Sequence, residues 1–363
     1  MKEKFKNIFT PFVITSVFIF LVIAALHFLS GLSYSIADGL NSTVSHAFRR
    51  ILATFGSIVP FSLLELFIIL LPLILFFVIR GAVRAFATKE SRTRFIATLC
   101  AVILLIYAGH LLALGIAHNA TPLGRKMGFD EAKVTEENLV DTLTLLRDEI
   151  NALAEDVPRN SDGVFDPEYS FDDISREVCA VYDRLAAEYG LIPGFKSRAT
   201  GVINGWAMCY LGISGIYSYP TGEANVNSYY PAYVNIYTTA HEMCHQRGIL
   251  RENEANFLAF LITATSDDSN FRYSGLMNIY SYVASALYRT NKEAYFEINS
   301  TLSDLAKEDM REANRITDKY DDTIIDKISD RINDFYLKSS GSDGVVSYSY
   351  VVRLVISYYE SER

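Results

Sequence analysis

The stretch from Ala240 to Asn256 reads Ala-His-Glu-Met-Cys-His-Gln-Arg-Gly-Ile-Leu-Arg-Glu-Asn-Glu-Ala-Asn. Within it, His241 and His245 are four residues apart, so on a helix their side chains lie one above the other on the same face. Two imidazoles placed in this way can bind one zinc ion. Glu242, directly after the first histidine, can then act as a general base toward a zinc-bound water. The stretch therefore predicts a catalytic zinc site on a helix.

Each residue of this motif also has an ordinary structural explanation. Thr239 and Glu242 have the spacing of a capping box at a helix start, and the two histidines are compatible with simple burial. These separate explanations do not account for the joint spacing of the two histidines and the glutamate. We therefore favour the metal interpretation.

A third protein ligand is expected in the residues that follow. In one known arrangement the motif continues as His-x-x-Gly-x-x-His, and Gly248 fits it. Its last position, however, is Arg251, and a guanidinium cannot bind a cation. In the other arrangement a second helix supplies a glutamate, and Asn253 is a suitable N-cap for such a helix. Geometry alone leaves both Glu252 and Glu254 as candidates.

The sequence resembles known protein families in two ways, and the first resemblance favours one of these two glutamates. Glu254-Ala255-Asn256 followed by an apolar helix resembles the third-ligand segment of glutamate-type zincins (gluzincins), in which the glutamate before alanine binds zinc. That resemblance favours Glu254. Further strings of the same region are Ser214-Gly215-Ile216-Tyr217, Thr221-Gly222-Glu223-Ala224-Asn225-Val226-Asn227, Ala240-His241-Glu242, Glu254-Ala255-Asn256-Phe257 and Arg272-Tyr273-Ser274-Gly275. Through these strings the chain resembles an uncharacterised bacterial family of three-span membrane proteins, which is defined by a domain of unknown function. This second resemblance implies an architecture and a zinc motif but no substrate.

Three apolar runs predict membrane spans at residues 12–29, 58–79 and 95–117. None has a polar face, and each is about long enough to cross a bilayer as a helix. The first run lacks a small-residue cleavage site, so we expect an anchor and not a removed signal peptide. The sequence thus predicts a membrane domain over residues 1–117 and a second domain over residues 118–363. Glu65 is the only acidic residue within a predicted span.

Basic residues predict the orientation of these spans. Three lysines precede the first span, five basic residues lie between the second and third spans, and two arginines lie between the first and second. We therefore expect the N-terminus to be cytoplasmic and residues 118–363 to lie outside the cytoplasmic membrane. Residues 1–117 carry a net charge of +6 and residues 118–363 a net charge of −15. So acidic an outer domain argues against nucleic-acid binding and mildly favours a basic or neutral substrate.

The second domain is expected to be mainly α and zincin-like, with a small sheet. Apolar residues step by three and four over 139–153 and again over 174–185, which is typical of amphipathic helices. Residues 190–237 are rich in glycine, asparagine and tyrosine and predict a small, irregular sheet before the zinc helix. Periodic charged sequence over 294–336 predicts two or more long helices. The final run, 345–359, is expected to be a helix, with a strand as the alternative.

The chemistry expected from these residues is hydrolysis. His241, His245 and Glu254 would hold Zn²⁺, which lowers the pKa of a bound water from 15.7 to about 7. Glu242 would take the proton and return it to the leaving amine. Residue type alone suggests Tyr273, Arg272 and Asn225 as stabilisers of the oxyanion, and Glu223 as a contact for a substrate amine.

These expectations together indicate a membrane-anchored zinc metallopeptidase that acts on a peptide or protein substrate. One alternative is an amidase or esterase that uses the same zinc on cell-wall material. Another is a non-catalytic membrane protein that binds a partner and has a structural or vestigial zinc site. A closed fourth coordination position would favour the non-catalytic alternative, and an open one beside Glu242 would favour an enzyme. The sequence does not indicate an oligomeric state.

Overall fold

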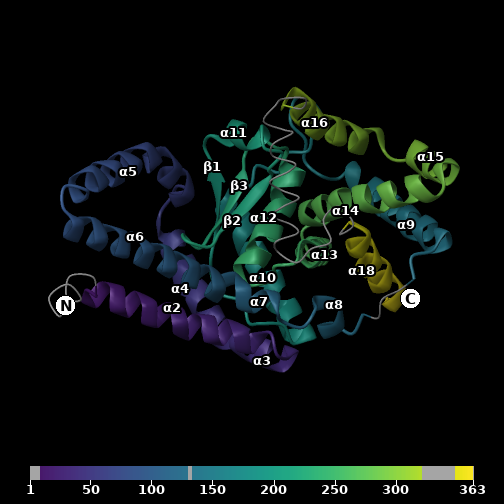
Figure 1. Ribbon diagram of the computed structural model, residues 1–363. Coiled ribbons are helices and arrows are strands. Elements are labelled where there is room, and N and C mark those ends of the chain that lie inside the picture. The colour runs from purple at the N-terminus through teal and green to yellow at the C-terminus, as the bar shows by residue number, and fades with distance from the viewer. Residues whose placement is uncertain (1–8, 130–132, 321–347, 363) are drawn as a thin grey trace. The chain divides into compact units, whose positions relative to one another are not determined.

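The computed structural model describes residues 9–129, 133–320 and 348–362 (Figure 1). The described chain is mainly helical with one three-stranded sheet, as predicted. It divides into two compact units. The first contains Met1–Thr121 and Ser218–Gly222, and the second contains Pro122–Tyr217 and Glu223–Arg363. The predicted boundary after residue 117 thus falls close to the boundary between the units along the chain.

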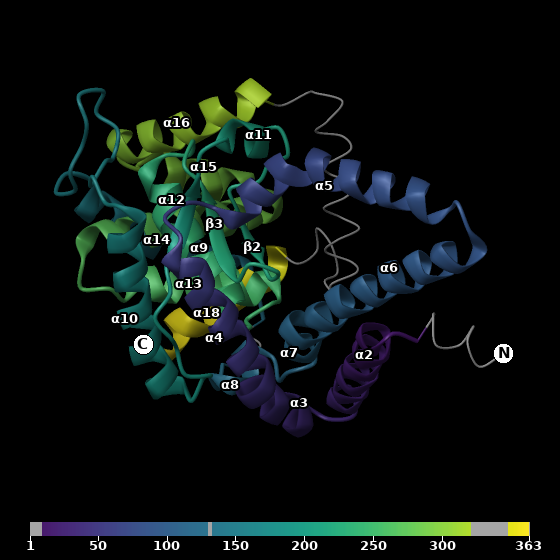
Figure 2. The ribbon, with the colours of Figure 1, turned by 90° about the vertical axis from the view of Figure 1, so that its left-hand side faces the viewer.

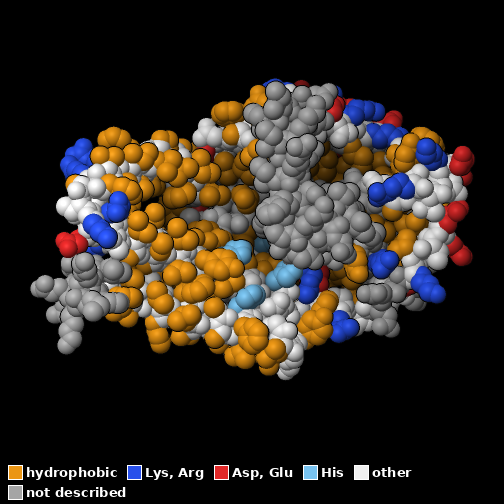
Figure 3. Space-filling view, in the orientation of Figure 1, with side chains coloured by type: hydrophobic (Ala, Val, Ile, Leu, Met, Phe, Trp, Pro, Cys, Tyr) orange, Lys and Arg blue, Asp and Glu red, His pale blue; other side chains and the backbone are white. Residues whose placement is uncertain are grey.

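The first unit contains three helices that are long and apolar enough to cross a membrane: α2 (Pro11–Ser30), α5 (Leu63–Ala85) and a continuous helix over Lys89–His118. The last of these begins as α6 (Lys89–His110) and continues through the π-helix η2 (Leu111–Gly115) into α7 (Ile116–His118). Helix α2 packs along α6 (Figure 2). Hydrophobic side chains cover the surface of α5 and α6 (Figure 3). Such surfaces suit contact with lipid, so the chain is a membrane protein.

The second of these helices is offset from the predicted span of residues 58–79. Ile58 still belongs to the preceding helix, and α5 begins after Ser62, whose side chain accepts a hydrogen bond from the Glu65 backbone N–H. Glu65 therefore lies in the first turn of α5, where the helix dipole favours a negative charge. The helix begins later than the predicted span because the run of apolar residues starts before the helix does.

The second unit contains the predicted amphipathic helices. Its helices are α8 (Leu123–Lys126), α9 (Glu136–Ala154), α10 (Phe171–Tyr189), α11 (Gly205–Cys209), α12 (Ala232–Gln246), α13 (Glu252–Ala264), α14 (Ser269–Thr290), α15 (Lys292–Ser300), α16 (Asp304–Tyr320) and α18 (Tyr348–Ser361). Capping boxes at Thr135 and Ser170 start α9 and α10, and Gly190 in a left-handed conformation ends α10. The final run is a helix, as expected. Part of the predicted helical region 294–336 lies outside the described residues.

The sheet lies within the predicted region 190–237. Its strands are β1 (Ala199–Val202), β2 (Gly215–Ser218) and β3 (Glu223–Asn227), in the order β1-β3-β2. Strands β1 and β3 are parallel, with Ala199 opposite Ala224. The central strand β3 is buried along its whole length, whereas β2 is an edge strand. Helix α12 packs against β3, so the sheet supports the helix that carries the histidine motif.

The core of the second unit lies around α12, α13 and α14, which pack on one another. Helix α13 is buried nearly all round, and Phe257 and Phe260 are fully buried within it. Full burial of an apolar side chain of this size contributes about 1.5–3 kcal/mol to stability. The burial of these side chains holds α13, the helix that follows the turn at Gly248, against α12 and α14.

Candidate metal centre

His241 and His245 lie on one face of α12, as their spacing predicts. Their ring centroids are 4.6 Å apart, and both side chains are mostly buried. The chain turns sharply after α12, with Gly248 at φ 91°, a conformation in which a side chain would be strained. This turn brings the beginning of α13 back against the two histidines.

Glu252, the first residue of α13, completes the cluster. One of its carboxylate oxygens lies 3.2 Å from Nε2 of His241, and the other lies 3.5 Å from Nε2 of His245. One potential ligand atom from each of the three residues lies within 4.8 Å of the other two. Two imidazole nitrogens and a carboxylate oxygen form a ligand set that suits zinc.

Glu254 has a different position from the one expected. Its carboxylate accepts a hydrogen bond from the backbone N–H of Leu123 at 2.9 Å and from the guanidinium of Arg251 at 3.1 Å. On a helix with 3.6 residues per turn, residues two positions apart point about 200° away from each other. Glu252 and Glu254 therefore cannot both face the histidines, and the structure brings Glu252 to them. The resemblance favoured Glu254 as the third ligand, whereas the glutamate that lies beside the histidines in this structure is Glu252.

The surroundings of His245 fit a metal-binding imidazole. Its Nδ1 lies 2.7 Å from the carbonyl oxygen of Ile249. When Nδ1 carries the proton and donates to that carbonyl, Nε2 keeps a lone pair directed at the cluster. Burial lowers the pKa of His245, but the carboxylate of Glu252 outweighs burial and raises that pKa to about 9. The Glu252 carboxylate thus stabilises the protonated form of His245, and its negative charge would also favour a metal cation at this place.

Glu242 is the fourth polar group of this site. Its side chain is buried, and its Oε2 has no hydrogen-bond partner among the described residues. Burial raises the pKa of this carboxyl, while the two neighbouring histidines act in the opposite direction. A buried carboxylate oxygen without a partner is costly, which is consistent with a place for a water or a substrate group.

Edge strand β2 lies against Glu242. A Cβ atom added to Gly215 would lie 2.7 Å from both Cγ and Oε1 of Glu242 and 2.5 Å from Cγ2 of Thr238. Only glycine allows the strand to approach α12 this closely. The backbone of Tyr217, also on β2, is hydrogen-bonded to Glu242 and favours its charged form. No pattern in the sequence indicated this role for Gly215 directly, although glycine inside a strand often marks a close backbone approach.

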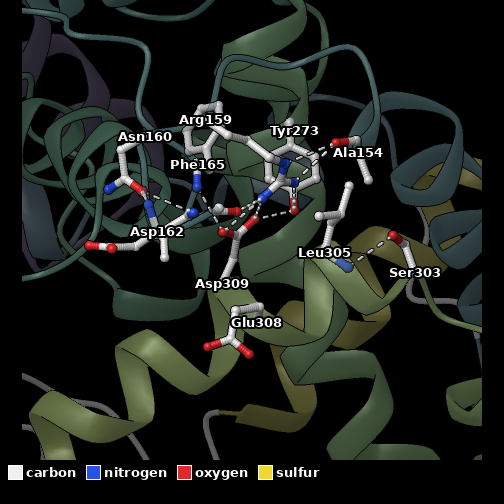
Figure 4. Close-up of polar contacts among 12 residues, drawn as sticks. Ala154, Arg159, Asn160, Asp162, Phe165, Tyr273, Ser303, Leu305, Glu308 and Asp309 are labelled. Atoms are coloured by element: carbon white, nitrogen blue, oxygen red, sulfur yellow. Dashed lines mark hydrogen bonds and ion pairs between the residues drawn. The ribbon is translucent and has the colours of Figure 1, made fainter.

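Tyr273, a proposed oxyanion stabiliser, takes part in a separate buried network (Figure 4). Its hydroxyl donates to Oδ2 of Asp309 at 2.5 Å. Asp309 is fully buried and also pairs with Arg159 at 3.2 Å and accepts from the backbone N–H of Phe165 at 2.8 Å. The network joins α14 and α16 to the loop after α9, so its geometry indicates a structural role. Sequence reasoning missed Asp309 and Arg159, which look like ordinary surface charges in the sequence.

The other predicted contact residues lie at two places. Asn225 and Glu223 are buried on β3, and the side-chain amide of Asn225 donates to the carbonyl of Ile216 at 3.3 Å. Arg272 is partly exposed on α14, where its charge lowers the pKa of Glu149 against the stronger, opposite effect of burial. Of the four predicted contact residues, Asn225 and Glu223 lie on the strand that packs against α12.

The fold and the site together define a helical membrane protein with a His–His–Glu cluster beside a buried glutamate. The chain belongs to the family described as "Protein of unknown function (DUF3810)", whose model matches residues 39–356. This agrees with the expected membership in an uncharacterised family. Neither a curated protein nor a solved structure matches the chain.

Proposed function

We propose that this protein binds Zn²⁺ through His241, His245 and Glu252 and hydrolyses peptide bonds with Glu242 as the general base. The observation that carries this proposal is the spacing of the three ligands. Two ligand atoms at about 2.0–2.1 Å from a tetrahedral zinc are about 3.3–3.4 Å apart. The distances from Glu252 to the two histidines are 3.2 and 3.5 Å. Each distance involves a different oxygen of Glu252, and each is close to the spacing of two ligand atoms on one zinc ion.

The number of ligands supports a catalytic site over a structural one. Structural zinc sites in proteins are closed by four protein ligands, whereas catalytic sites have three and leave one position for water. The cluster has three members among the described residues. The partnerless oxygen of Glu242 is the group that would receive a proton from such a water.

Zinc held by these three residues would supply a Lewis acid and lower the pKa of a bound water to about 7. Glu242 would serve as the group that accepts a proton from water and returns it to the leaving nitrogen. Glu252 compensates the positive charge, and the Ile249 carbonyl keeps the ring of His245 oriented. Strand β2 is an edge strand close to Glu242, and an extended peptide that added to this strand would have its backbone near Glu242.

The charges around the spans support a location in the cytoplasmic membrane, with the metal cluster on the outer side. Basic residues precede α2 and surround the connection between α5 and α6. Basic segments of this kind stay in the cytoplasm. Three crossings then place the second unit outside, where the substrate would be a peptide or protein.

The test uses the full-length protein in lipid nanodiscs, loaded with zinc and incubated with a library of fluorogenic peptides. We expect cleavage by the wild type. We expect about 10²–10⁴-fold slower cleavage by Glu242→Gln, because the proton acceptor is lost while the zinc stays bound. Stoichiometric zinc without cleavage of any peptide would refute the peptidase proposal. Hydrolysis of ester or cell-wall amide substrates instead would identify the alternative hydrolase.

A further inference from the structure

The segment between the first two spans is helical, not a loop. It consists of α3 (Tyr34–Leu40), the π-helix η1 (Asn41–Ser45) and α4 (His46–Ile58), which follow one another without a break. The segment belongs to the same unit as the three spans. Sequence reasoning used only its two adjacent arginines, as charges in a connecting loop.

The polarity of this segment is inverted relative to a helix in water. Its buried positions recur every four residues and include three polar side chains: Ala37, Asn41, Ser45, Arg49 and Ala53. Its large apolar side chains face outward and are 40–71% exposed: Tyr34, Ile36, Val44, Ile51, Phe55 and Ile58. A helix on a water-soluble protein buries its apolar face and exposes its polar one. The opposite arrangement suits a helix surrounded by lipid.

Two of the three buried polar side chains, Arg49 and Asn41, pair with each other, as a lipid environment favours, whereas Oγ of Ser45 has no hydrogen-bond partner among the described residues. The guanidinium of Arg49 is fully buried. It donates to the side-chain oxygen of Asn41 at 2.8 Å and to the carbonyl oxygen of Ala113 at 2.9 Å. Asn41 and Ala113 belong to the two π-helices η1 and η2. Arg49 therefore joins the segment to the third span by hydrogen bonds that need no water.

The remaining charges are few. Besides Arg49, the ionisable side chains of the segment are Asp38, His46 and Arg50. Asp38 accepts hydrogen bonds from the backbone N–H of Thr121 at 3.1 Å and from its hydroxyl at 2.6 Å. Arg50 is exposed and long enough to extend toward a headgroup region. The outward face thus carries apolar side chains and one basic side chain, together with Ser42, Thr43 and Thr54, whose hydroxyls donate to backbone carbonyls of the same segment.

The segment is long enough to cross a membrane, at roughly 37 Å for a rise of 1.5 Å per residue. The charge distribution argues against a crossing. If the segment crossed, the basic residues before α2 and those between α5 and α6 would lie on opposite sides of the membrane, contrary to the positive-inside rule. We propose that α3, η1 and α4 form a membrane-embedded amphipathic helix that enters and leaves on the same side, with its apolar face in contact with lipid acyl chains.

A tryptophan reporter tests the contact with lipid. Trp206 is the only tryptophan, so Trp206→Phe gives a silent background in the full-length protein. Phe55→Trp places a reporter on the proposed face, and Phe296→Trp places a control at a similarly exposed position in the other unit. In phosphatidylcholine vesicles with brominated acyl chains, we expect strong quenching of the Phe55→Trp reporter and little quenching of the control.

Two results would overturn the proposal. In the first, aqueous iodide quenches the Phe55→Trp reporter as strongly as the control, and brominated lipid does not. In the second, neither reagent quenches it, which would mean that protein covers this face. Circular dichroism and melting curves matched to the wild type show that the reporters have not disturbed the fold.

Cysteine labelling tests whether the segment crosses the membrane. Leu32→Cys and Pro60→Cys place thiols at exposed positions beyond its two ends, and the wild type measures labelling of the native cysteines. With a membrane-impermeant maleimide, we expect the two introduced thiols to be labelled to the same extent as each other, both in intact cells and in permeabilised cells. If one is labelled in intact cells and the other only after permeabilisation, the segment is a fourth span and the proposal fails.

Discussion

Replacement of Glu252 by glutamine should release zinc from the protein, whereas the same replacement at Glu254 should not. The structure places the Glu252 carboxylate 3.2 and 3.5 Å from the two histidine nitrogens. It places the Glu254 carboxylate against Leu123 and Arg251 instead. The two glutamates are two residues apart on the same helix, so each variant is a matched control for the other.

The expected size of the effect follows from the number of ligands. Four-ligand zinc sites bind with about 10–16 kcal/mol, so one ligand contributes about 2.5–4 kcal/mol. Since 1.4 kcal/mol corresponds to a factor of ten, Glu252→Gln should raise the Kd for zinc by a factor of about 100 or more. Glu254→Gln should retain zinc and lower the free energy of unfolding by about 1–3 kcal/mol, because it weakens buried, charge-assisted hydrogen bonds.

The assay measures zinc in the purified full-length protein by mass spectrometry and the Kd by competition with a chromogenic chelator. Melting curves of each variant establish that it is folded. Loss of zinc from Glu254→Gln with an intact fold, together with full zinc in Glu252→Gln, would refute the ligand set. It would mean that the helix carrying both glutamates rotates on metal binding.

Three further predictions concern groups around the cluster. Gly215→Ala should keep zinc but slow peptide cleavage by about 100-fold, because the added methyl group displaces Glu242 by a few tenths of an ångström or more. Equal cleavage rates for this variant and the wild type would contradict the close approach of β2 to Glu242. Asp309→Asn should lower the free energy of unfolding by about 3–5 kcal/mol, measured by denaturant titration, because it leaves Arg159 mostly buried without its carboxylate. Its zinc content should not change. A chelator should lower the melting temperature and zinc should restore it, because the ion binds only the folded protein; an unchanged melting temperature would argue against a built site.

Local patterns in the sequence were sufficient for much of this protein. Length and apolarity identified three membrane helices, although the second was displaced because apolar residues also precede it. Four-residue spacing placed His241 and His245 on one helix face. Periods of three and four residues located α9 and α10, and a change in composition located the sheet. Each of these features depends on neighbours in the chain, so the sequence alone could predict it.

The candidate contacts were less predictable. Tyr273 was selected for its hydroxyl, but that hydroxyl donates to Asp309, which is distant along the chain. Such a pairing depends on how α14 and α16 pack, and no local pattern encodes it. The lipid-facing segment after α2 was also missed, because its four charged or titratable residues concealed an apolar face that becomes visible only when burial is known.

The sequence by itself determined which helix carries the histidines, which glutamate follows the first of them and which segments are apolar enough for a membrane. Only the tertiary structure showed that Glu252, and not Glu254, lies beside the histidines. The reason is geometric: the turn at Gly248 and the packing of α13 on α12 and α14 set the rotation of α13 about its own axis. A side chain's direction changes by about 100° per residue on a helix, so that rotation determines which carboxylate faces the histidines.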